Sequence, residues 1–243
     1  MNLYKWEMRQ NFRSKIFWFI GGAFLLFTCL FHLDNIIHGG IGGYELFLTL
    51  CSNFNSLALF FIGIFAGLHI TGAFEDRRMQ AAVMAGNSRM KVLFTKFASF
   101  VTAIAIFFTA SVIVPSIAGF IRFGTACEDG SFLRNVIARA PLFLFTQIAA
   151  CAVCFIISTL CKKQGIAVII NMVTLMALNI GSQFIAFTDW GETVVQFLPQ
   201  GQSIIVIGDM SNGSIAFAFS VCALFVLLFF TGSYAKVSKE ELK

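Results

Sequence analysis

The sequence predicts an all-α, polytopic membrane protein with six transmembrane helices and no separate soluble domain. Hydrophobic residues make up 58% of the 243 residues, and phenylalanine alone occurs 31 times. Charged residues make up 12%, whereas a soluble domain of ordinary composition carries about a quarter. Apolar runs long enough to cross the ~30 Å hydrocarbon core recur along the whole chain. Residues 1–243 are therefore expected to form a single transmembrane domain.

Residues 1–15 are expected to form a helix that lies on the cytoplasmic leaflet. They carry four basic residues and a single acid, Glu7, with aromatic side chains such as Tyr4 and Trp6 among them. Basic amphipathic helices with aromatic side chains at headgroup depth lie in the membrane interface. The alternative is that these residues are only the basic flank of the first span.

The first span is expected at about 16–33. A cleavable signal peptide would have a shorter apolar core followed by small residues, whereas bulky residues end this run, so a signal peptide is not expected. Residues 32–44 are expected to be a short outer loop because Gly-Gly-Ile-Gly-Gly lies within them.

The second span is expected at about 45–74. A helix of this length would reach about 45 Å at 1.5 Å per residue, which exceeds the hydrocarbon core, so it tilts or protrudes. Gly63 and Gly67 form a small-residue motif that lets two helices approach closely. Packing within the chain and dimerisation explain this motif equally well.

A polar stretch with both acids and bases separates the second and third spans, and its residues 75–86 are expected to form a short amphipathic helix. Glu75 and Asp76 would lie in its first turn, where the helix dipole favours negative charge. Gly86 would end it. The apolar positions recur at i, i+3, i+4 and i+7, on one helical face: Met79, Ala82, Val83 and Gly86.

Three further elements are expected next: the third span at about 90–120, an outer loop at 121–139 and the fourth span at about 141–161, followed by a tight inner turn at 162–165. Lys96 is expected to extend its ammonium group to the inner surface. Pro115 is expected to kink the outer end of the third span. Pro141 is expected to begin the fourth span.

The fifth span, at about 166–187, is expected to have one polar side. Its polar residues fall within about half of the helix circumference at 100° per residue. They are Asn171, Thr174, Asn179, Ser182 and Gln183. Two interpretations stay open: this side faces a substrate path or a dimer partner, or it makes ordinary hydrogen bonds between helices.

Residues 188–213 are expected to be an outer segment that is partly inserted in the outer leaflet. They contain two apolar patches, each too short to span, on either side of Pro199-Gln200-Gly201-Gln202. The last span is expected at about 214–234, with a short polar tail after it.

The distribution of basic residues predicts that both termini and the 75–86 helix lie in the cytoplasm. Six spans put both termini on one side. Fourteen of the seventeen Lys and Arg residues then lie on that side, and the other three lie between 122 and 139. This is the positive-inside pattern. It also explains the net charge of +5, so the charge does not indicate a nucleic-acid partner.

The sequence predicts no catalytic, cofactor or metal site. It contains neither a Gly-x-x-x-x-Gly-Lys-Ser/Thr phosphate loop nor a His-Glu-x-x-His zinc motif. Cys151 and Cys154 have no second pair and no nearby histidine, so they are expected to be inert buried thiols. His69 is expected to pack near the inner interface. Ion-coupled transport is not favoured because no ionisable residue is expected in the middle of a span.

The run Gly-Ala-Phe-Glu-Asp-Arg-Arg-x-x-x-Ala-Ala-x-Met-Ala-Gly-Asn-Ser-Arg-x-x-x-Leu-x-x-Lys, at 72–96, resembles the first intracellular segment of ABC-2 type permeases. Those are membrane subunits of bacterial ABC exporters. The resemblance implies a type V (ABCG-like) fold in the bacterial plasma membrane, in which residues 75–86 form the coupling helix. The residues it implies as ATPase contacts are Glu75, Asp76, Arg77, Arg78, Met79, Val83 and Arg89.

The resemblance also implies the partners. A second permease, identical or a sister chain, would pair with this one, and two cytoplasmic ABC ATPases would bind ATP and Mg, so that this chain binds no cofactor and is not an enzyme. Short members of the family resemble exporters or immunity subunits for bacteriocins, lantibiotics and amphipathic peptide toxins, which implies a hydrophobic or amphipathic substrate.

Two other classes of function fit the sequence less well. An ATP-independent channel or facilitator for a small or lipid-like solute would need polar linings along several helices, and only the fifth span has one. An intramembrane enzyme would need catalytic groups that the spans lack.

Overall fold

The computed structural model describes residues 3–38, 42–124, 132–186, 188, 191–207 and 212–239, and every regular element in these ranges is a helix. The elements are α1 (Leu3–Arg13), α2 (Lys15–His38), α3 (Gly43–Ala66), the π-helical η1 (Gly67–Thr71), α4 (Gly72–Glu75), α5 (Arg78–Met84), α6 (Arg89–Phe108), the π-helical η2 (Thr109–Ile113), α7 (Val114–Phe123), α8 (Phe132–Leu160), α9 (Gln164–Ala186), α10 (Gly191–Val195), α11 (Pro199–Ile207) and α12 (Asn212–Lys239).

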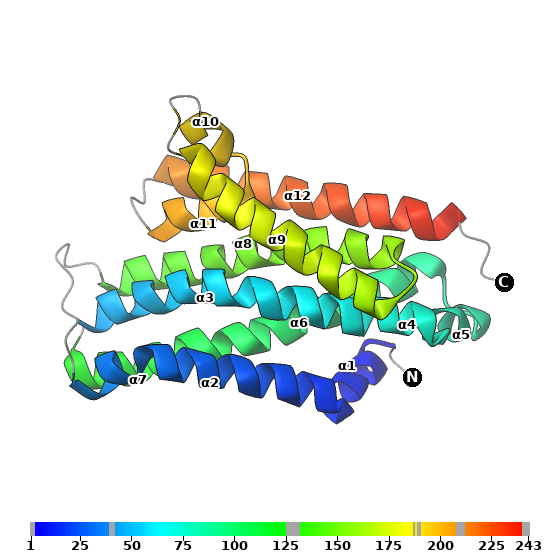
Figure 1. Ribbon diagram of the computed structural model, residues 1–243, viewed down its shortest axis with the longest axis horizontal. Helices are drawn as coiled ribbons and strands as arrows, with labels where there is room; N and C mark the ends of the chain where they lie inside the picture. Colours follow the sequence, from blue (N-terminus) through cyan, green and yellow to red (C-terminus); the bar gives the residue numbers. More distant parts are fainter. Residues whose placement is uncertain are drawn as a thin grey trace.

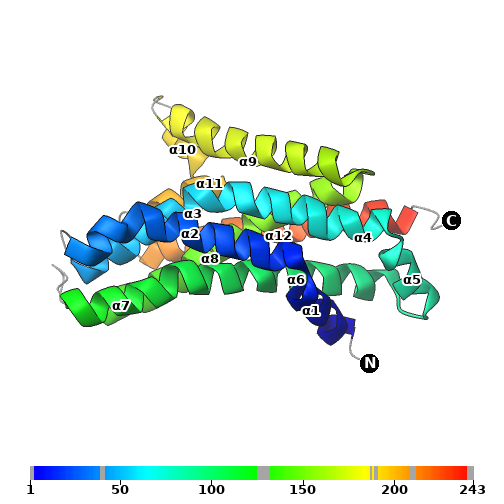
Figure 2. The ribbon, with the colours of Figure 1, turned by 60° about the horizontal axis from the view of Figure 1, so that its bottom comes forward.

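The long helices run side by side along the long axis of the molecule (Figure 1). Five helices of the described ranges are long and apolar enough to cross a bilayer, and six are if α1 and α2, which meet at 64°, count as one broken span. Both chain ends and α5 lie at one end of the bundle, which we call the α5 end, while α10 and α11 lie at the other (Figures 1 and 2).

Two spans are continuous helical runs, each interrupted by one wider π turn. The first run is α3–η1–α4 and the second is α6–η2–α7. The π turn η2 ends just before Pro115, which has no backbone N–H to donate to a helical hydrogen bond. Single π turns within α-helices occur often at functional sites.

Phenylalanine forms much of the core where these helices meet. The centroid of the Phe54 ring, for example, lies 5.0 Å from that of Phe24 on α2 and 5.1 Å from that of Phe108 on α6, both edge to face. Edge-to-face aromatic pairs stabilise by about 0.5–1.5 kcal/mol beyond the area they bury. The high phenylalanine content therefore serves packing between helices as well as contact with lipid.

Helices α9 and α12 lie at the periphery of the bundle. Only 22% of the apolar stretch of α9 and 11% of that of α12 is buried within the chain. Their exposed side chains are large and apolar, such as Ile169, Phe184 and Leu227. Lipid or another protein subunit must cover these faces, because a contiguous apolar surface of this kind is unfavourable in water.

Gly63 and Gly67 allow α3 and η1 to lie directly on the backbone of α9. A Cβ atom on Gly67 would lie 2.7 Å from the backbone nitrogen of Val168, and one on Gly63 would lie 3.2 Å from that of Met172. Of the two explanations open for this motif, the structure shows packing within the chain.

Two boundaries expected from the sequence are wrong. The loop expected at 32–44 is helical through His38, because a chain at membrane depth satisfies its backbone polar groups by continuing the helix. Residues 132–139 belong to α8, so Pro141 lies inside that helix rather than at its start. α12 continues to Lys239, so the first part of the expected polar tail is helical.

The contact at Gly67 predicts that Gly67→Ala destabilises the protein. The added methyl group would push α9 away from η1, and overpacking of this kind costs about 1–3 kcal/mol. Thermal unfolding in detergent, followed by tryptophan fluorescence, should show a lower midpoint temperature.

Gly181→Ala is the matched control, because nothing lies within 4 Å of a Cβ atom at that position of α9. Replacing this helical glycine should leave the midpoint unchanged or raise it. Equal effects of the two substitutions would contradict the packing described for Gly67.

Candidate functional site

The charged connection between the second and third spans contains a shorter helix than the sequence predicts. The helix expected over 75–86 is α5, which covers only Arg78–Met84. Glu75 is the last residue of α4, and Arg77 has a left-handed backbone conformation (φ 57°), which breaks the helix between α4 and α5. Glu75 and Asp76 therefore do not lie in the first turn of α5.

The apolar face of α5 packs against the rest of the chain. Met79 is only 4% exposed and belongs to the hydrophobic core, against which Ala82 and Val83 also pack. The opposite face is exposed and, apart from the charged Arg77 just before the helix, has small or apolar side chains. We call it the α5 ridge: Arg77, Ala81, Met84 and Ala85. Met84 is 81% exposed. Hydrophobic periodicity identified the apolar face, but Met79 and Val83 on it were expected to contact an ATPase, and in the structure they pack against the chain itself.

Glu75 joins this connection to the turn between α8 and α9. Its Oε2 accepts a hydrogen bond from the backbone N–H of Gln164, at 3.2 Å. Gln164 is the first residue of α9, so the carboxylate satisfies a free N–H at the positive end of that helix.

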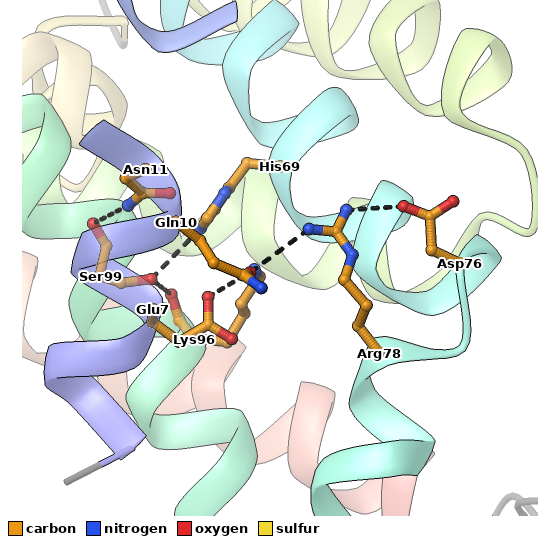
Figure 3. A network of polar contacts seen from close by, with 8 residues as sticks. All are labelled: Glu7, Gln10, Asn11, His69, Asp76, Arg78, Lys96 and Ser99. Carbon is orange, nitrogen blue, oxygen red and sulfur yellow. Dashed lines mark hydrogen bonds and ion pairs between the residues drawn. The ribbon is translucent and has the colours of Figure 1, made fainter. Parts of the chain in front are cut away.

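Arg78 joins α5 to the N-terminal helix. Its Nη2 lies 2.7 Å from Oδ2 of Asp76, and its Nη1 donates to Oε1 of Gln10 at 3.4 Å (Figure 3). The Nε of Arg78 is buried and has no hydrogen-bond partner in the described structure. Arg78 thus bridges α1 and the turn before α5 while keeping one donor unused.

A buried ion pair holds α1 against α6. Nζ of Lys96 lies 2.8 Å from Oε2 of Glu7, and the two side chains are 1% and 8% exposed. The expectation that Lys96 reaches the inner surface is wrong, because Glu7 supplies a counter-charge inside the protein. The N-terminal helix expected over 1–15 is present as α1, with Glu7 and Asn11 facing the bundle and its basic residues exposed.

Further hydrogen bonds extend this pair into a network (Figure 3). Nδ2 of Asn11 donates to the Ser99 carbonyl at 3.5 Å, and the Ser99 hydroxyl lies 3.2 Å from Nε2 of His69. The His69 ring stacks on Phe65 with a centroid distance of 5.1 Å. The network therefore connects α1, η1 and α6 at the same depth.

Arg89 caps the end of the last helix. Its Nη1 donates to the carbonyls of Ser238 at 2.8 Å and Val237 at 3.4 Å, in the last turn of α12. Carbonyl groups there have no partner within the helix. The structure gives Arg89 this intramolecular role, and its contact with an ATPase stays a prediction.

The polar side of α9 is partly satisfied within the chain. Nδ2 of Asn171, which is fully buried, donates to Oγ of Ser158 on α8 at 2.8 Å. Ser182 donates to the Asn179 carbonyl at 2.8 Å, and Gln183 donates to the Asn179 side chain at 3.1 Å. Thr174 is half-buried. Hydrogen bonding between helices explains Asn171, and a substrate path along these residues stays a prediction.

No group of three or more His, Cys, Asp or Glu side chains comes together at metal-ligand spacing within the part of the chain that the structure describes. Cys151 and Cys154 are both buried in the core of α8.

The sequence matches a known protein family over most of its length. A family model described as "ABC-2 family transporter protein" matches residues 3–178, which is more than two thirds of the chain and runs from α1 into α9. No curated protein matches the sequence.

The buried pair predicts strong coupling between Glu7 and Lys96. Glu7→Gln or Lys96→Met alone would leave one buried charge unpaired, which costs about 3–5 kcal/mol. The double variant removes both charges and should be considerably more stable than the sum of the single effects. Thermal unfolding of the four proteins in detergent gives the coupling as a double-mutant cycle. Strictly additive effects would show that the pair does not form.

Proposed function

We infer the function of this chain from the family to which it belongs: it is a member of the ABC-2 family of transporter proteins. It is therefore a multi-pass membrane component of an ABC transporter. Members of this family are generally non-catalytic and normally pair with an ABC ATPase.

We propose that the chain is the permease subunit of an ATP-driven exporter in the bacterial plasma membrane. It pairs with a second permease, identical or a sister chain, in a type V (ABCG-like) arrangement with both termini in the cytoplasm. Two ATPase subunits bind ATP and Mg at the α5 end. This orientation is supported by the basic residues, which gather at that end.

The proposal rests on how the charged connection between the second and third spans is built. One side of α5 is exposed, and the other side is attached to the rest of the chain. The α5 ridge is exposed, so a groove on an ATPase can hold it, with Met84 as the apolar anchor and Arg77 as the charge that sets register. The inward side of α5 is fastened to three parts of the chain. Met79 packs in the core, Arg78 contacts α1, and Glu75 at the end of α4 caps α9.

These attachments make α5 a lever. When ATP closes the ATPase dimer, the α5 ridge moves with its ATPase, and the three attachments pass this displacement to α1, the core and α9. Rigid-body rotation of the two permeases about their interface then changes access to the substrate path.

We propose that the substrate is hydrophobic or amphipathic, and that it is a peptide such as a bacteriocin or toxin that is moved out of the cell or the membrane. Resemblance to short permeases of peptide exporters supports the peptide class.

The lever predicts that substitutions on the α5 ridge uncouple ATP hydrolysis from transport. Met84→Asp would put a carboxylate into an apolar groove, and Arg77→Glu would reverse a contact charge. Each should lower co-purification with the ATPase and ATP-driven transport by roughly tenfold or more. Membrane insertion should stay normal, because both side chains are exposed.

Lys239→Glu is the matched control, since it makes the same charge reversal at an exposed position at the end of α12. It should leave ATPase binding and transport close to normal. Transport that continues without ATP, or that is insensitive to both ridge substitutions, would favour the channel or facilitator instead.

A further inference from the structure

A small polar hollow lies where α1 bends away from α2 at the α5 end. Its volume is ≈ 70 Å³. Its polar wall consists of Gln10, Asn11, Ser14, His69 and Arg78. Figure 3 shows four of these side chains converging from α1, η1 and α5. The 64° angle between α1 and α2 creates this space, because it separates α1 from the axis of the first span.

An apolar groove continues from the hollow along α2 and α3. Its volume is ≈ 410 Å³, and it shares Ile16 and Leu68 with the lining of the hollow. Lys15 is the only charged residue among the described residues that line it, and the rest of the lining is apolar: Phe19, Ile20, Phe61 and Ile64. Because Ile16 and Leu68 belong to both spaces, a single amphipathic molecule can occupy them together.

The charges around the hollow favour an anion. Arg78 contributes a guanidinium group with one buried, unpartnered N–H, and Lys15 lies at the groove. The acids of the network are already paired, Glu7 with Lys96 and Asp76 with Arg78. Phosphate oxygens are strong acceptors for guanidinium donors.

We propose that the hollow and the groove bind one anionic phospholipid of the leaflet at the α5 end. Its phosphate lies in the hollow against Arg78, with Lys15 nearby, and one acyl chain lies in the groove between α2 and α3. Such lipids concentrate near basic residues at the membrane surface. A soluble phosphate could use only the hollow, whereas the adjoining groove provides a surface for the chain. The site requires only membrane embedding and does not depend on an ATPase.

The experiment is lipid retention measured by native mass spectrometry. Delipidated, detergent-purified protein is mixed with equal amounts of phosphatidylglycerol and phosphatidylcholine. The wild type should retain phosphatidylglycerol in clear excess. Arg78→Gln and Lys15→Gln should each lower its affinity by about fivefold, which corresponds to the loss of one basic residue near the surface. Thermal unfolding checks that each variant is folded, and Lys15→Gln does not disturb the contacts of Arg78.

Arg9→Gln is the matched control, because Arg9 is an exposed basic residue of α1 that does not line the hollow. It should leave retention unchanged. If it lowers retention as much as Arg78→Gln does, the preference reflects general charge and the site is overturned. Equal retention of the two lipids by the wild type would overturn it as well.

Ile64→Trp and a soluble competitor distinguish a lipid from free phosphate. Tryptophan at position 64 would fill the groove and leave the charges in place, so phosphatidylglycerol retention should fall. Glycerol phosphate alone should compete poorly. Full displacement by glycerol phosphate, together with normal retention by Ile64→Trp, would show a phosphate site without a lipid and would contradict the proposal.

Discussion

The ion pair between Glu7 and Lys96 is the interaction on which the α5 end of this protein depends. A charged pair with almost no exposure is stable only when both partners are present and well placed, because each buried charge alone is costly. The pair therefore fixes the position of α1 along α6. Once α1 is fixed, Gln10 is in reach of Arg78, and Asn11 and His69 meet at Ser99. The bend between α1 and α2 and the hollow within it follow from the same placement.

This arrangement explains how a short connection can act as a lever. A helix of two turns is not stable by itself, so α5 depends on the packing of Met79 and on the contacts of its neighbours. Those contacts lead to α1, to the core and to α9. A force applied to the α5 ridge would thus be shared among several spans. Family membership and this construction together support the proposal of an ATPase-coupled permease.

The sequence predicted the helical architecture well, because long apolar runs in a membrane have few alternatives to helices. It could not locate the contacts that organise the α5 end. Glu7 and Lys96 are 89 residues apart, and nothing in their local sequence indicates that they pair. Periodicity identified the apolar face of α5 but could not indicate which way that face points. Arg77 has a left-handed backbone conformation, which shortens the helix. Because the residue there is not a glycine, the sequence does not indicate this conformation. Arg89 illustrates the same limit, since its partners belong to the far end of the chain.

The orientation of α5 is the central claim, and photo-crosslinking to the ABC ATPase tests it most directly. A photoreactive residue is placed at Met84, on the α5 ridge, or at Met79, on the face that packs in the core, and each protein is irradiated in membranes that contain the ATPase. We expect a covalent product with the ATPase from position 84 and none from position 79. A product from position 79 with none from position 84 would contradict it.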